Sequence, residues 1–167
     1  MLGDGRVEGA LIPSIELQRI PGLAIARDVC VAARDRVRSV LLVSSVPIDR
    51  IRSVALDTQS RTSVALVRIL LGRFRGVRPE YTSAAPDLAG MLERNDAALL
   101  IGDPAMTSDT SGCEVYDLAQ LWRDATRLPF VFAVWGLRAN RFGEGGPDFR
   151  AALTEGRRAV PRIAERY

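Results

Sequence analysis

Short apolar runs alternate with amphipathic segments along most of this chain, and the alternation restricts the folds available to it. The runs SVAL at 53–56 and AALLIG at 97–102 have the length and the small aliphatic composition of buried strands. Between and after them, segments 60–72 and 115–128 carry apolar residues at helical spacing. Strands that alternate with helices favour layers, so we predict an α/β fold with a mostly parallel sheet.

The remaining segments fit the same scheme. Residues 7–13 predict a short strand, and the apolar stretch 23–45 predicts two or three buried strands. Pro47 breaks that pattern, so 47–52 is expected to form a turn or a short helix. Further strands are expected at 79–84 and 129–138, and further helices at 86–95 and, after the glycine-rich segment 142–146, from Pro147 towards Tyr167.

The order of these elements divides the chain into two lobes. Residues 47–130 contain strands and helices that can form one lobe by themselves, lobe two. Residues 1–46 and 131–167 are expected to form parts of lobe one. We expect the ligand in a cleft between the lobes, because pockets concentrate at domain interfaces.

The basic residues restrict the chemistry, because all 23 are arginine and the chain has neither lysine nor histidine. The absence of lysine excludes a Schiff base and a P-loop lysine. The absence of histidine excludes a Ser-His or Cys-His pair and disfavours a zinc site, so no metal is expected. Cys30 and Cys113 lack metal-ligand spacing; Cys30 is expected in the core, and the low cysteine content fits a reducing compartment.

The net charge of +3 is spread over scattered arginines, and Arg73, Arg75 and Arg78 form one group after a predicted helix. A helix C-terminus favours cations, and the single aromatic residue among these arginines, Phe74, does not make the row of aromatic side chains that a nucleic-acid platform requires. We therefore expect a solvated helix end and no nucleic-acid partner. No apolar stretch is long enough to span a bilayer, and the first ten residues do not form a signal peptide, so we expect a cytoplasmic protein without membrane contact.

The segment DTQSRTS at 57–63 places small hydroxyl residues between a strand and a helix. Ser60 is the expected N-cap, and Thr62 falls in the first helical turn. The start of a helix has unpaired amides and the positive end of the helix dipole, so it can bind a small carboxylate. Simple capping of the helix explains these residue types equally well. Arg61 opposes the dipole there, so it either pairs with Asp57 or binds a ligand carboxylate.

Other polar residues at strand ends raise the same question. Ser14 follows the first strand, and Ser39 comes just before another. Ligands gather at strand ends in open α/β sheets, but serines there also serve as ordinary turn residues. Asp103, in the turn Gly102-Asp103-Pro104, either places a carboxylate in the cleft or caps the next turn.

Four longer motifs, ALIPSIE, VALDTQSRTSVALVRILL, ALLIGDPAM and YDLAQLWRDATRLPFVFAVW, together resemble the chorismate dehydratases of menaquinone biosynthesis, which act in the futalosine pathway. The similarity extends from about Gly9 to about Trp135. It implies the two-lobed fold of type 2 periplasmic-binding proteins in a cytoplasmic enzyme without metal or organic cofactor. The implied reaction removes water from chorismate to give 3-[(1-carboxyvinyl)oxy]benzoate.

The resemblance also implies substrate contacts. The matching positions are Ser39, Ser60, Arg61 and Thr62, to which Ser14 and Asp103 are added. Members of the family carry a Ser-Tyr-Leu-Asn type motif after their first strand, and this sequence contains no such motif. We therefore name no catalytic residue, expect a chain truncated at both ends with an incomplete lobe one, and expect residues 1–167 alone to be inactive.

The implied reaction is an aromatising elimination, in which a proton leaves C3 of the ring and hydroxide leaves C4. The base is either the enolpyruvyl carboxylate of the substrate or one of the carboxylates Asp57 and Asp103. Two other functions fit the same fold: a non-catalytic solute-binding protein and the related 1,4-dihydroxy-6-naphthoate synthase. The motifs SRTSVALVRILL and LPFVFAVW are more similar to the dehydratase.

Overall fold

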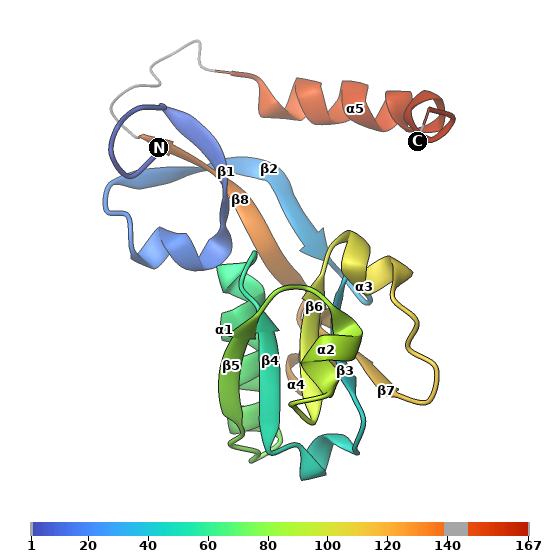
Figure 1. The fold of residues 1–167 in the computed structure, drawn as a ribbon. Helices are drawn as coiled ribbons and strands as arrows, with labels where there is room; N and C mark the ends of the chain where they lie inside the picture. Colours follow the sequence, from blue (N-terminus) through green and yellow to red (C-terminus); the bar gives the residue numbers. More distant parts are fainter. Residues whose placement is uncertain (1, 139–146, 167) are drawn as a thin grey trace. The chain divides into compact units, whose positions relative to one another are not determined.

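The computed structural model describes residues 2–138 and 147–166 of the chain (Figure 1). The glycine-rich segment 142–146 and Tyr167 lie outside these residues. The elements in chain order are β1 Gly9–Pro13, η1 Ser14–Gln18, β2 Leu23–Ala33, β3 Val40–Ser44, η2 Ile48–Arg50, β4 Ser53–Asp57, α1 Arg61–Ile69, η3 Leu70–Phe74, β5 Glu80–Ala84, α2 Leu88–Leu92, β6 Ala97–Ile101, α3 Asp103–Thr107, β7 Glu114–Asp117, α4 Leu118–Thr126, β8 Phe130–Arg138 and α5 Phe149–Ala164.

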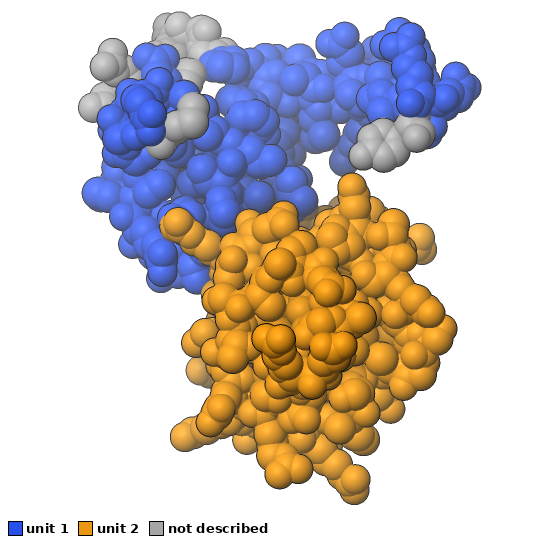
Figure 2. All heavy atoms as spheres, viewed as in Figure 1, with its two compact units in different colours: residues 1–31, 133–167 blue, residues 32–132 orange. Residues whose placement is uncertain are grey.

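The chain forms two compact units, which Figure 2 shows in different colours. Unit 1 comprises residues 1–31 and 133–167, and unit 2 comprises residues 32–132. Residues 32–46, expected in lobe one, lie in unit 2. The reason is that β3 pairs with β6 and β7 inside the larger sheet.

Unit 2 is built on a five-stranded sheet of order β5-β4-β6-β3-β7. Strands β5, β4 and β6 are parallel, and α1 and α2 connect them in turn. Strand β3 is antiparallel to both β6 and β7. The α/β layers are confirmed, but the prediction of a mostly parallel sheet holds only for the three strands that helices connect.

The core of unit 2 lies on both faces of this sheet, because successive side chains of its strands belong to two different apolar clusters. Leu42 and Leu99, both fully buried, face α1 and α4 on one side. Val43 and Leu100, their neighbours in sequence, pack with α2 and α3 on the other. Successive side chains of a strand point to opposite faces, so these almost continuous apolar runs identify strands that are buried on both faces.

Unit 1 contains a three-stranded sheet of order β1-β8-β2, in which β1 and β8 are antiparallel. Its small core is formed by Leu2, Ile12 and Val134. The prediction of buried strands in 23–33 is wrong, because β2 lies at the edge of this sheet and most of its residues are exposed. Cys30 is accordingly exposed rather than in the core, which corrects the expectation for this thiol.

Two expected boundaries differ from the structure. Gly72 does not end the helix that starts at Arg61, because the chain continues through the π-helical turn η3 to Phe74, and Gly76, with φ of +70°, follows. Tyr116 belongs to strand β7 rather than to a helix, and its hydroxyl accepts a hydrogen bond from the Ile48 amide at 3.0 Å. Burial is the main cause that raises the pKa of Tyr116.

Candidate functional site

One edge of the unit 2 sheet collects most of the predicted site residues. The parallel strands β4, β5 and β6 all end there, and β3 begins there because it runs antiparallel to β6 with Val40 opposite Ile101. The Gly102 amide donates to the Ser39 carbonyl at 2.8 Å across this edge. We call it the polar edge, formed by Ser39, Asp57, Ser60, Arg61, Thr62 and Asp103.

The start of α1 is held by its own hydroxyl groups. The Ser60 side chain accepts from the Ser63 amide at 3.2 Å and from the Ser63 hydroxyl at 3.0 Å, so the predicted N-cap is confirmed. Thr62 and Ser63 are buried, whereas Arg61 is exposed. Because no acidic residue lies in the first turn of α1, the positive end of its dipole is available to an anion.

Asp57, the last residue of β4, is 1% exposed. Its Oδ1 accepts from the Gln59 amide at 3.0 Å, which fixes the turn into α1. Its Oδ2 is buried and has no hydrogen-bond partner. The alternative in which Arg61 pairs with Asp57 is therefore not what the structure contains.

Asp117, which lies in the predicted helical segment 115–128, supports the polar edge. Its Oδ1 accepts from the Ala119 and Gln120 amides at 3.0 and 3.1 Å, and its Oδ2 accepts from the Val37 and Arg38 amides at 2.9 and 2.8 Å. One buried carboxylate thus joins the start of α4 to the turn that leads to Ser39. An aspartate before an amphipathic helix signals the cap, but nothing in the sequence signals the second partner.

The two remaining predicted residues are Asp103, at the polar edge, and Ser14. Asp103 is exposed at the start of the short helix α3, where its carbonyl accepts from the Thr107 hydroxyl at 2.8 Å. The expected turn at this position is therefore helical. Ser14 begins η1 in unit 1.

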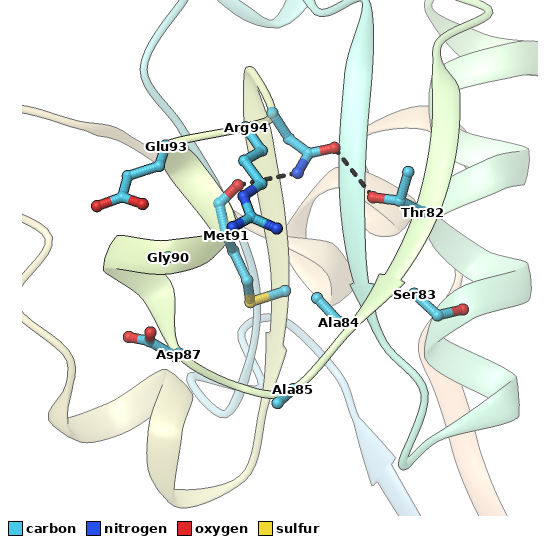
Figure 3. Close-up of a pocket in the computed structure, with 10 residues that line it drawn as sticks. Thr82, Ser83, Ala84, Ala85, Asp87, Gly90, Met91, Glu93 and Arg94 are labelled. Carbon is cyan, nitrogen blue, oxygen red and sulfur yellow. Dashed lines mark hydrogen bonds between the residues drawn. The ribbon is translucent and has the colours of Figure 1, made fainter.

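Two hollows in the surface of unit 2 are lined by other residues. Figure 3 shows one of about 430 Å³ between β5 and α2, where the Thr82 hydroxyl donates to Asn95 Oδ1 at 3.0 Å and Asn95 Nδ2 donates to the Met91 carbonyl at 2.9 Å. A second hollow, of about 670 Å³, is lined by Arg52, Arg75 and Arg78 near the starts of β4 and β5. Neither hollow contains a predicted site residue.

No group of three or more cysteine or acidic residues suited to a metal ion occurs within residues 2–138 and 147–166. In the same ranges, no helix combines the length and the apolar character needed to cross a membrane. The groups present at the polar edge are helix amides, hydroxyls, one guanidinium and two carboxylates.

A sheet edge at which parallel strands end and a capped helix begins is typical of α/β proteins that bind small molecules there. Residues 1–166 match the family described as menaquinone biosynthesis, and the chain belongs to that family. It is 35% identical over 156 residues to the chorismate dehydratase of Thermus thermophilus, and the match covers 83% of this chain and 57% of that relative.

The chain thus spans a little over half the length of the curated relative that it matches. Among solved structures, it is similar to a protein of Archaeoglobus fulgidus from a structural genomics programme, with a TM-score of 0.69 at 19% identity. That match covers 97% of this chain and 61% of the Archaeoglobus protein. At this identity the similarity shows a shared fold.

Proposed function

We propose that this chain carries the substrate-binding part of a chorismate dehydratase, which eliminates water from chorismate to give 3-[(1-carboxyvinyl)oxy]benzoate. The observation that carries the proposal is the 35% identity to the chorismate dehydratase of Thermus thermophilus. The proposal includes a two-lobed fold of the type 2 periplasmic-binding-protein kind with the substrate in its cleft, and a place in the cytoplasm. The shared family of menaquinone biosynthesis supports it.

The polar edge suits the charges of this substrate. Chorismate carries two carboxylates, and the start of α1 presents backbone amides with the buried hydroxyl residue Thr62. Arg61 is exposed next to them, and its planar guanidinium can bind a carboxylate through two hydrogen bonds. In the proposal, Ser39, Ser60 and Asp103 line the same end of the substrate, and Ser14 contacts it from lobe one.

The chemistry asks little of the protein beyond orientation. A proton leaves C3 and hydroxide leaves C4, so the atoms balance as one water molecule without an oxidant or reductant. We propose that the enolpyruvyl carboxylate of the substrate accepts the C3 proton, since the chain has no histidine to serve as base. The protein then contributes by fixing the geometry of the ring and by hydrogen-bonding both carboxylates.

Turnover in a chimera tests the proposal. In this chimera the chain replaces the matching 57% of the Thermus thermophilus enzyme, so that the rest of the relative is supplied unchanged. We expect the folded chimera to convert chorismate into the aromatic product, measured by chromatography, while residues 1–167 alone do not. A folded chimera that binds chorismate without product indicates a solute-binding protein, and one that accepts only the substrate of 1,4-dihydroxy-6-naphthoate synthase indicates that enzyme.

A further inference from the structure

One buried carboxylate at the polar edge has hydrogen-bonding capacity that the fold does not use. Asp57 is 1% exposed, and its Oδ2 has no partner. A buried acceptor without a donor is destabilising, and most buried polar groups in native proteins are paired. Such a group is therefore a candidate for a functional role.

The turn between β4 and α1 does not require this second oxygen. Only Oδ1 takes part in the turn, through the hydrogen bond from the Gln59 amide at 3.0 Å. An asparagine would supply the same acceptor without a charge. No hydrogen bond reaches Oδ2, from Arg61 or from any other described residue.

The position of Asp57 favours one kind of ligand group. The nine-residue helix α1 begins four residues later, and Thr58 and Gln59, which lie between, are exposed. A ligand bound at the helix start therefore lies over this turn. A carboxylate of that ligand would be repelled by Asp57 and belongs at the helix amides, whereas a hydroxyl group can donate to Oδ2.

We propose that Asp57 Oδ2 accepts a hydrogen bond from the hydroxyl group of the ligand that binds at the start of α1. The inference rests on the proposed function, because chorismate carries one hydroxyl, at C4, besides its two carboxylates. The dehydrated product keeps both carboxylates and lacks this hydroxyl. Asp57 thus distinguishes substrate from product, since a site built for a hydroxyl rejects the analogue that leaves its polar group unpaired.

Binding of both molecules to the full chain tests this role. The dissociation constants of chorismate and of 3-[(1-carboxyvinyl)oxy]benzoate are measured by titration calorimetry for the wild type, for Asp57→Asn and for the control Asp87→Asn. Asp87 precedes α2 and makes no side-chain cap hydrogen bond. We expect Asp57→Asn to weaken chorismate binding about 10- to 100-fold and to leave product binding unchanged, while the control changes neither.

Folding is followed in parallel, because the role predicts no loss of stability. Asp57→Asn keeps the acceptor for Gln59 and removes a buried charge, so its melting temperature should be no lower than that of the wild type. If this variant does not fold, the same two ligands are titrated into Asp57→Ser, because the serine hydroxyl can replace Oδ1 as the acceptor in the turn.

Equal weakening of both ligands, or no weakening of chorismate, in a folded Asp57 variant contradicts the inference alone. A wild-type chain that binds neither ligand contradicts the proposed function and this inference with it.

Discussion

Arg61 is an exposed cation at the first position of a helix, where the dipole disfavours it. In the proposed site it binds a substrate carboxylate, so Arg61→Ala should weaken chorismate binding by about 1.5–3 kcal/mol, the range for a hydrogen bond to a charged group. Calorimetric titration measures the affinity. Arg73→Ala, which removes another exposed arginine outside the polar edge, serves as the control and should bind normally. A large drop in melting temperature for Arg61→Ala with unchanged affinity would indicate a structural role.

Thr62 is 3% exposed in the first turn of α1. Valine has the same shape and lacks the hydroxyl, so Thr62→Val should preserve the helix, whose cap is Ser60. We expect kcat/KM of the chimera for chorismate to fall about tenfold or more, the usual cost of a lost hydrogen bond of about 1.5 kcal/mol. Thr154→Val, which changes an exposed threonine of α5, is the matched control. Full activity of Thr62→Val would remove this hydroxyl from the site.

Asp117 connects elements that are far apart in the sequence. Its carboxylate receives amides from the start of α4 and from the turn before β3. Asp117→Ala should therefore lower the free energy of unfolding by about 2–4 kcal/mol, from the lost cap and from partly buried amides left without an acceptor. Urea unfolding measures this free energy, with Asp87→Ala as the control. Asp87 makes no cap hydrogen bond, so this control should lower the free energy of unfolding by less than about 0.5 kcal/mol. Equal losses in both variants would show that the bridge to Val37 and Arg38 adds nothing.

The elements of unit 2 were largely predictable from the sequence because their signals are local. Strands β4 and β6 are apolar runs, and α1 begins at a serine cap, as expected. Strand β7 was missed because its four residues, EVYD, run directly into α4, and its pairing with β3 is a long-range contact. The exposure of β2 was missed as well, since its composition resembles that of a core strand while its position at a sheet edge is set by the whole fold.

The candidate site was predictable to the extent that it follows the chain. Ser60, Arg61 and Thr62 are consecutive, so one cap places all three. Ser39 and Asp103 meet the same edge only because β3 runs antiparallel to β6, which no local pattern reveals. The unpaired oxygen of Asp57 is likewise a property of the packed structure.

At the scale of the whole molecule, the two units differ in how much core each contains. Both apolar clusters of the larger sheet lie within residues 32–132, with side chains such as Leu42, Leu66 and Leu99 almost fully buried, whereas the core cluster of unit 1 has three buried residues. Because burial of apolar surface drives folding, the fragment 32–132 should fold by itself. We expect a dispersed amide spectrum and cooperative urea unfolding. A collapsed spectrum with no unfolding transition would show that unit 2 depends on the rest of the chain.

The central claim is that the polar edge of unit 2 binds chorismate, and hydrogen–deuterium exchange of the full chain tests it most directly. Amide exchange is compared with and without saturating chorismate. The account predicts slower exchange at 57–64 and at 101–105, where the strands end and α1 begins. Protection confined to 82–95, around the hollow of Figure 3, or no protection at any segment, would contradict it.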